Sequence, residues 1–129
     1  MKISIITIVY NNKACIAACI ESVLAQTHHN IEHVVIDGGS TDGTQEVIAP
    51  YIENLGYYVS EKDSGLYNAL NKGIQKCTGD VIGILHSDDL FYETSTLAKI
   101  ASQFQNSQAD LVYANGLYVQ RENTDCIRR

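Results

Sequence analysis

Short apolar runs, separated by segments with helical periodicity, most constrain the fold of this 129-residue chain. The first run, "ISIITIVY" (3–10), is rich in β-branched residues and apolar at nearly every position, and "IEHVVIDGG" (31–39) repeats the pattern. Such runs are typical of strands that are covered on both faces of a parallel sheet. Shorter runs at 56–60 and 80–86 predict a third and a fourth strand, and "ADLVYANGLYVQ" (109–120) predicts a fifth.

The segments between the runs have apolar residues at helical spacing and predict helices at 11–26, 40–54, 64–77 and 94–106. An asparagine at position 11 or 12 is available to cap the first helix, and Asp42 with Gln45 has the spacing of a capping box. Pro50 lies too deep for the first turn of its helix, so we expect a kink or an early break there.

This alternation predicts an α/β fold, in which right-handed crossovers build a mostly parallel sheet with helices on both faces. A chain of this length suffices for one domain, residues 1–129. The formal net charge is −6 and the basic residues are scattered, so we expect no nucleic acid partner. The amino-terminal apolar run is far shorter than the roughly 20 residues of a membrane span, which predicts a soluble, cytoplasmic protein.

Polar residues cluster where the predicted strands end, at 10–12, 37–40, 63–65 and 87–89. In open parallel sheets, ligands bind outside the carboxyl ends of the strands. The turn after the first strand, "YNNKAC", contains no glycine, which excludes a GxGxxG dinucleotide site, and the chain has no GxxxxGK phosphate loop. A phosphoacceptor receiver domain would need an acidic pair at that turn, where this chain has asparagines.

Two of these side chains have both a binding and a structural interpretation. The ring of Tyr10 offers a flat face on which a nucleobase can stack, but the residue is equally a half-buried core tyrosine. Asp37 can accept a hydrogen bond from the N3–H of uracil or thymine. It can also cap the turn "DGGS" by bonding the backbone two residues on. The sequence leaves both pairs of alternatives open.

Asp88 and Asp89 close the fourth apolar run. Adjacent carboxylates about 4 Å apart repel each other by roughly 1 to 4 kcal/mol, and a divalent cation removes that cost. Mg²⁺ or Mn²⁺ is usually held by one or two carboxylates together with substrate phosphates. The alternative is that both acids only begin the next helix, where the macrodipole favours negative charge.

Three stretches taken together resemble the nucleotide-sugar-binding half of family 2 inverting glycosyltransferases with the GT-A fold. They are "SIITIVYNN" (4–12), "SVLAQTHHNIEHVVIDGGSTDGT" (22–44) and "EKDSGLYNALNKGIQKCTGDVIGILHSDD" (61–89). The resemblance implies a Rossmann-like half of a GT-A fold that binds a UDP-linked sugar together with Mn²⁺ or Mg²⁺. It also implies sugar transfer to a glycan or lipid-linked acceptor in cell-surface polysaccharide biosynthesis, with peripheral membrane contact but no membrane span.

At the base, the resemblance implies that the backbone near Val9 and the ring of Tyr10 enclose the pyrimidine. Asp37 is then expected to accept the N3–H of the base, and Asp63, in "EKDSG", matches an acidic position that edges the same pocket.

Toward the phosphates, the resemblance implies that Asp88 bonds the ribose and that Asp89 ligates the metal, which would act as a Lewis acid on the leaving group. Asn71 and Lys72, in "ALNKGI", match an asparagine and a basic residue that lie near the nucleotide. Both also fit an ordinary exposed helix surface, and the sequence does not decide between the two uses.

The chain departs from the family pattern at two positions and in its length. His86 stands where many relatives carry Asp, and Ile8 with Val9 stands where many have Pro-Thr. After Phe91 no residue is a convincing general base for an acceptor hydroxyl, so the catalytic residue is unknown. We therefore expect a truncated domain that lacks the acceptor half.

Two alternatives use the same strand ends. A non-catalytic nucleotide-sugar-binding module would bind the donor without transferring the sugar. An unrelated nucleotidyltransferase-like α/β domain would prefer a nucleoside triphosphate. In a donor-binding half, a sheet edge and helix faces left uncovered would favour a homo-oligomer.

Overall fold

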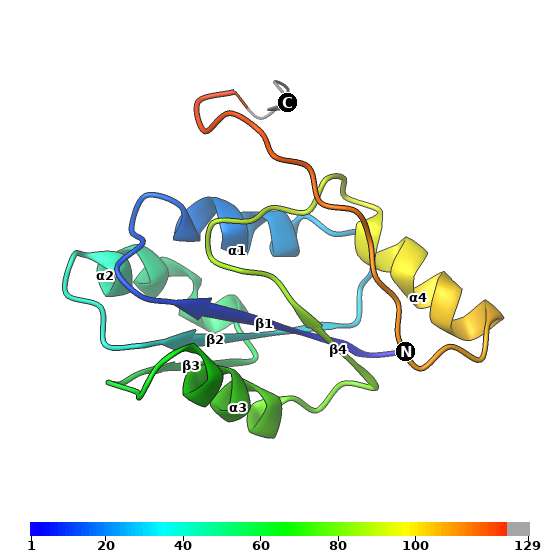
Figure 1. The fold of residues 1–129 in the computed structure, drawn as a ribbon, viewed down its shortest axis with the longest axis horizontal. Coiled ribbons are helices and arrows are strands. Elements are labelled where there is room, and N and C mark those ends of the chain that lie inside the picture. The colour runs from blue at the N-terminus through cyan, green and yellow to red at the C-terminus, as the bar shows by residue number, and fades with distance from the viewer. Residues whose placement is uncertain (124–129) are drawn as a thin grey trace.

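The apolar runs pair into one parallel sheet in the computed structural model of the chain, which describes residues 1–123. Its strands are β1 (Ile3–Val9), β2 (Ile31–Asp37), β3 (Tyr57–Ser60) and β4 (Val81–Ile84), in the order β3-β2-β1-β4 (Figure 1). All three pairings are parallel. The four carboxyl ends therefore open on the same edge of the sheet.

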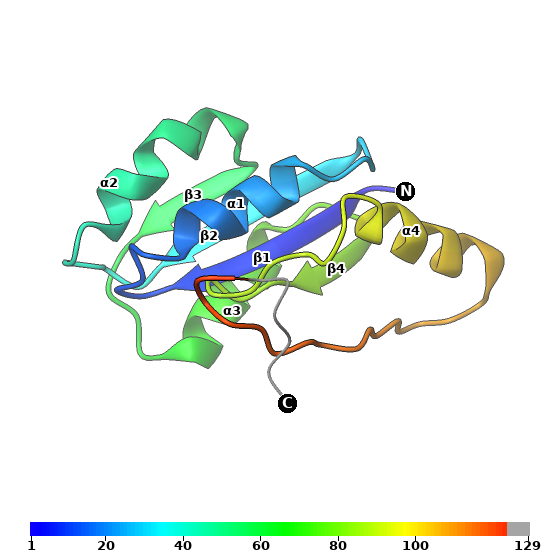
Figure 2. The same ribbon diagram turned by 90° about the horizontal axis from the view of Figure 1, so that it is seen from above.

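Helices cover both faces of this sheet (Figures 1 and 2). One face carries α1 (Ile16–Leu24), α2 (Thr44–Ile48), the 3₁₀ helix η1 (Ala49–Asn54) and α4 (Thr96–Asn106), and the other carries α3 (Leu66–Lys76). The predicted fold class, a mostly parallel sheet with helices on both faces, is confirmed. Within the described residues, none of the helices has the length and apolar character needed to cross a membrane.

The side chains of β1 fill the core on both faces, because successive residues of a strand point in opposite directions. Ile5 packs in a cluster with residues of α1 and α4, whereas Ile6 packs in a cluster with Ala69 of α3. Val9 packs against α1 and α2, and its register partner on β2 is Asp37. Asp37 therefore points toward the α1 face of the sheet.

Two helix starts differ from the expected ones. No asparagine side chain caps α1, because the helix begins later than expected, with Cys15 as its N-cap residue, and Asn12 lies three residues before that position. At α2, Asp42 accepts the backbone N–H two residues on, at 2.9 Å, which is an Asx turn rather than a capping box. The break expected at Pro50 is confirmed, since α2 gives way to η1, which has a proline in its first turn.

The fifth strand predicted at 109–120 is wrong. This stretch lies within the described residues and forms no strand, and Leu111, Tyr113 and Tyr118 are each more than three quarters exposed. An extended segment becomes a strand only when its N–H and C=O groups pair with a neighbour. Among residues 1–123, β4 has no strand on its outer side. The 109–120 segment therefore does not form the backbone hydrogen bonds with β4 that would make it a fifth strand.

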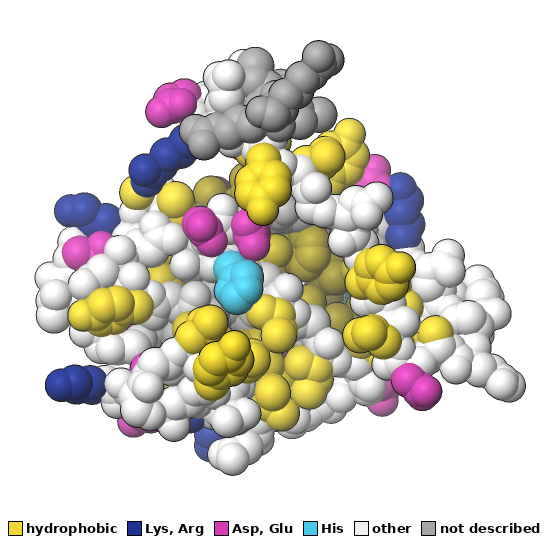
Figure 3. All heavy atoms as spheres, in the orientation of Figure 1, with side chains coloured by type: hydrophobic (Ala, Val, Ile, Leu, Met, Phe, Trp, Pro, Cys, Tyr) yellow, Lys and Arg dark blue, Asp and Glu magenta, His cyan; other side chains and the backbone are white. Residues whose placement is uncertain are grey.

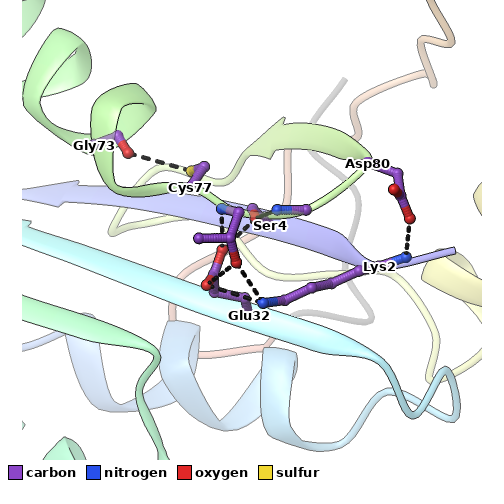
Figure 4. A network of polar contacts seen from close by, with 8 residues as sticks. Lys2, Ser4, Glu32, Gly73, Cys77 and Asp80 are labelled. Carbon is purple, nitrogen blue, oxygen red and sulfur yellow. Dashed lines mark hydrogen bonds and ion pairs between the residues drawn. The ribbon is translucent and has the colours of Figure 1, made fainter.

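A polar network near the amino ends of the strands ties β4 to its neighbours (Figure 4). The carboxylate of Glu32 on β2 accepts hydrogen bonds from Ser4 Oγ, Lys2 Nζ, and both the N–H and Oγ1 of Thr78. Burial by itself raises the pKa of Glu32, but these bonds outweigh it and lower the pKa to about 2. The segment that enters β4 is thus held against β1 and β2 at the point where β4 begins.

Candidate functional site

A hollow of about 380 Å³ lies where β1 and β2 end, on the α3 side of the sheet. The strand ends and the loop between β3 and α3 line it with Ile8, Val9, Tyr10, Gly38, Lys62, Asp63, Gly65 and Leu66. Three predicted site residues, Val9, Tyr10 and Asp63, are therefore brought together. The sequence motifs did not single out Ile8, Lys62 or Leu66 as lining residues, because adjacency across strands depends on the register.

Tyr10 is held at the rim of the hollow by the residue that follows it. Asn11 adopts a left-handed conformation, with φ of 47°, which asparagine tolerates better than most residues. Its N–H donates to Ser40 Oγ at 2.8 Å, and its side-chain oxygen accepts the N–H of Thr41 at 2.8 Å. The end of β1 is thus fixed to the turn after β2, and the ring of Tyr10 stays 64% exposed, as stacking a base requires.

Gly38 keeps the space between Tyr10 and Asp63 open. A methyl group built at Gly38 would lie 3.5 Å from Tyr10 Cδ2 and 3.5 Å from Asp63 Oδ2. A side chain larger than that of alanine would therefore fill the gap between ring and carboxylate. Positive φ, the other use of glycine in this turn, belongs to Gly39, whose φ is 81°.

Asp37 lies beneath this edge, on the opposite side of the sheet from the hollow. It is fully buried, and its carboxylate accepts the Ser40 N–H at 3.0 Å and the hydroxyls of Ser40 and Ser60. Asp37 thus caps the turn, one of the two roles that the sequence offered, but through the N–H three residues on rather than two. A contact between Asp37 and a base stays a prediction.

Asp63 lines the hollow, and one of its two carboxylate oxygens is unsatisfied. Its Oδ1 accepts the N–H of Gly65 at 3.1 Å. Its Oδ2 is shielded from solvent and has no hydrogen-bond partner in the described part of the chain. Such an oxygen is costly unless a ligand or a water molecule donates to it.

Asp88 and Asp89 lie in an exposed turn after β4, outside the lining of the hollow. The N–H of Asp89 donates to the carbonyl of His86 at 3.0 Å, and the Asn12 amide donates to Ser87 Oγ at 3.0 Å. This second bond ties the loop after β1 to the loop after β4. Figure 3 shows two acidic side chains beside a histidine on one face of the molecule. Because β4 runs parallel to β1, the Asp88–Asp89 pair follows a strand end on the same sheet edge as the hollow.

Cys19 lies under this turn as a fully buried thiol. Its thiol donates to the carbonyl of His86 at 3.4 Å. Burial raises the pKa of Cys19 to about 12, and the charges of Asp89 and Asp88 add to the rise, although a bond with Thr7 opposes it. A thiol that stays protonated is neither a nucleophile nor a metal ligand.

Comparison with known proteins identifies the family. The sequence profile described as "Glycosyl transferase family 2" matches residues 4–129. The chain belongs to glycosyltransferase family 2. The acidic pair after β4 and the polar turn after β2 are thus the strand ends of a family 2 chain, as the resemblance of the sequence motifs implied.

Curated relatives of this family 2 chain are longer than it is. A "PGL/p-HBAD biosynthesis glycosyltransferase" of Mycobacterium bovis is 37% identical over 116 residues, which cover 87% of this chain and 45% of the relative. A glycosyltransferase of Nostoc sp. is 37% identical over 110 residues, 83% of this chain and 34% of the relative. The chain therefore spans less than half the length of these relatives.

Solved structures confirm the Rossmann-like half of a GT-A fold. S. aureus TarS 1–349 in complex with UDP is similar with a TM-score of 0.77 and 28% identity, over 85% of this chain and 34% of that one. A mannosyltransferase from Pyrobaculum calidifontis in complex with GDP-Man and Mn²⁺ has a TM-score of 0.72 and 28% identity, over 78% of this chain and 31% of that one.

Asn71 and Lys72 on α3 are not among the residues that line the hollow in this family 2 chain. Lys72 Nζ lies 2.8 Å from Glu61 Oε1, so the lysine is held against the loop that carries Asp63. Asn71 is exposed on the same helix. The structure therefore places Lys72 beside the rim and leaves the nucleotide contacts of both residues as predictions.

A second hollow, of about 220 Å³, lies away from this edge, near the start of β2. Its lining includes His28, His29 and His33. Even so, residues 1–123 contain no group of three histidine, cysteine or acidic side chains placed to hold a metal ion. The hollow at the carboxyl ends of the strands is the better candidate site, because open parallel sheets bind their ligands at that edge.

Proposed function

We propose that this chain binds the donor of a metal-dependent, inverting glycosyl transfer, and that the donor is a UDP-linked sugar. The observation that carries the proposal is the hollow at the ends of β1 and β2. There the exposed ring of Tyr10, the gap over Gly38 and the unsatisfied oxygen of Asp63 face one another. A flat base with an N–H donor on its edge fits all three features.

The relatives support a nucleoside diphosphate donor. TarS is described in complex with UDP and with UDP-GlcNAc, and the mannosyltransferase in complex with GDP-Man and Mn²⁺. The mycobacterial relative is named for PGL/p-HBAD biosynthesis. We propose that the sugar passes to a glycan or lipid-linked acceptor of cell-surface polysaccharide biosynthesis, as the family resemblance implies.

In this proposal Asp88 bonds the ribose and Asp89 holds Mn²⁺ or Mg²⁺, with Asn71 and Lys72 near the nucleotide. The two carboxylates fit part of the coordination shell of such an ion. Both are exposed on one turn, which leaves room for phosphate and water ligands. When bound, the ion would stabilise negative charge on the leaving diphosphate. The residue that would deprotonate the acceptor stays unassigned, and the activity of the whole protein is part of the proposal.

Isothermal titration of the chain with UDP, with and without Mn²⁺, tests the donor site. We expect binding that tightens with Mn²⁺. The variant Asp89→Ala should lose the Mn²⁺ dependence, because it removes the proposed ligand. Asp37→Ala should weaken UDP binding about tenfold even without metal, because it removes the acceptor of the Ser40 and Ser60 hydrogen bonds that hold the turn after β2.

Asp110→Ala is the matched control, because Asp110 is an exposed carboxylate on the segment after α4. This variant should bind UDP as the unmodified chain does. If the unmodified chain binds UDP in neither condition, the donor-site proposal is wrong. If Asp89→Ala keeps the full Mn²⁺ effect, the metal belongs to other residues.

A further inference from the structure

The identity of the base depends on which carboxylate meets it, and the fold argues against Asp37. Residues of β1 and β2 that pair in register share a face, so Asp37 lies on the α1 side with Val9. The hollow lies on the α3 side, where Ile8 and Leu66 line it. The oxygens of Asp37 are moreover taken by Ser40 and Ser60.

We propose that Asp63 is the residue that selects the base, and that it accepts one hydrogen bond from the imide N–H of uracil or thymine. The inference rests on the proposed function of the hollow and assigns its specificity. Asp63 lines the hollow. Its Oδ2 and the Tyr10 Cδ2 each lie 3.5 Å from the position that a methyl group at Gly38 would occupy. A base stacked on the ring would bring its edge to this oxygen.

The state of the two Asp63 oxygens determines which base fits. Oδ1 already accepts the N–H of Gly65, and Oδ2 has no partner within residues 1–123. One free acceptor matches uracil or thymine, whose edge carries a single N–H between two carbonyl groups. Guanine offers two adjacent donors, which suit a carboxylate with both oxygens free. Cytosine has an acceptor at N3, which a carboxylate repels.

The surroundings of Asp63 favour this selectivity. Its free oxygen is shielded from solvent, so a mismatched base would leave it without a donor and would lose affinity. The loop that carries Asp63 is held by the ion pair between Glu61 and Lys72, at 2.8 Å. Lys72 therefore acts as a positioning residue for this loop, and it need not contact the base.

The test is isothermal titration of the chain with UDP, dTDP, CDP and GDP in Mn²⁺. We expect UDP or dTDP to bind at least about tenfold more tightly than CDP and GDP, as one satisfied bond to a charged group requires. An added dUDP arm, compared with dTDP, distinguishes uracil from thymine as the natural base, because these two ligands share the deoxyribose and differ only in the base methyl group. In Asp63→Asn the amide can donate to N3 of cytosine, so the preference for UDP over CDP should narrow or reverse.

Two controls separate this role from a structural one. Asp37→Asn should weaken all four nucleotides by a similar factor, because it loosens the turn that carries Gly38 without changing the base contact. Asp110→Asn, the same chemical change on the exposed segment after α4, should leave all four affinities unchanged.

A ligand-side measurement needs no variant to fold. UDP methylated at N3 lacks the imide proton and should bind the unmodified chain at least about tenfold less tightly than UDP. The inference is overturned if N3-methyl-UDP binds as UDP does, if GDP is preferred, or if Asp63→Asn leaves the ratio of UDP to CDP affinity unchanged. Absence of any UDP binding would overturn the proposed function and this assignment with it. UDP binding without base selectivity would overturn only the assignment.

Discussion

His33 shows how burial sets the acid stability of this chain. It is 3% exposed, its Nε2 lies 2.9 Å from Thr7 Oγ1, and its Nδ1 has no partner among the described residues. Burial lowers the pKa of His33 to about 4. In the unfolded chain the imidazole takes up its proton near pH 6.5, so the unfolded state binds more protons between pH 6.5 and 4. Stability therefore falls as the pH drops through this window.

Urea unfolding at pH 7 and pH 5 measures this effect. We expect the free energy of unfolding to fall by about 2 kcal/mol between these values, as the difference between the two pKa values requires. The variant His33→Gln should show a flatter dependence, because it has no titrating group. His29→Gln, at an exposed histidine, should keep the original dependence. If the free energy of unfolding falls equally steeply in His33→Gln, other titrating groups cause the loss of stability.

The sequence identifies the candidate residues of the site, but not the face of the sheet to which each side chain points. Strand-end position and chemistry identify Tyr10, Asp37 and Asp63 as candidates. In a strand buried on both sides, apolar residues occupy every position, so the pattern does not say which face a given residue takes. The face of Asp37 follows from its register against Val9 and from the helices that cover each side. Both depend on the tertiary structure, so the sequence alone could not decide between the turn cap and the base contact as the role of Asp37.

At the scale of elements, the segment just before β4 requires glycine at position 79. A methyl group at Gly79 would lie 2.6 Å from Ser4 Oγ, 2.7 Å from Ser4 N and 2.9 Å from Lys2 O. Backbone atoms of β1 cannot move aside without breaking the strand pairing. We expect Gly79→Ala to destabilise the chain by about 1 to 3 kcal/mol, the usual cost of an overpacked site.

Chemical denaturation of Gly79→Ala beside Gly116→Ala checks this expectation. Gly116 has no atom within 4 Å of its methyl position in the described part of the chain, so alanine there should change the midpoint little. Equal denaturation midpoints for the two variants would show that the backbone around Gly79 can shift to make room for a methyl group. A selective loss in Gly79→Ala should also weaken UDP, because β4 positions the acidic pair.

The elements themselves were predictable where the pattern was local. β1, β2 and β3 form where apolar β-branched or aromatic runs lie between turn residues, and the break at Pro50 follows from its missing N–H. Helix starts were less predictable, because α1 begins at Ile16 with Cys15 as its N-cap residue, past the asparagines that could have capped it. The failed strand at 109–120 has the right composition but no partner among the described residues.

At the scale of the whole molecule, the sheet is covered unevenly. α3 covers the β1 and β2 part of its face, but the β4 part is open. Ile82 and Ile84, opposite Ser4 and Ile6 in register, point to the α3 side and are 44% and 51% exposed. The outer edge of β4 also has no strand neighbour within residues 1–123. An unpaired edge beside an apolar patch favours association with another chain.

We therefore expect the 129-residue chain on its own to self-associate through β4, with a second copy pairing at the free edge and covering the isoleucines. Sedimentation velocity over a range of concentrations should show a rising sedimentation coefficient. The double variant with Ile82→Lys and Ile84→Lys should stay monomeric, because lysine on an edge strand opposes both pairing and apolar contact. Ile52→Lys, at a similarly exposed isoleucine on η1, is the matched control and should associate as the unmodified chain does. A monomer at every concentration would show that solvent alone satisfies this edge.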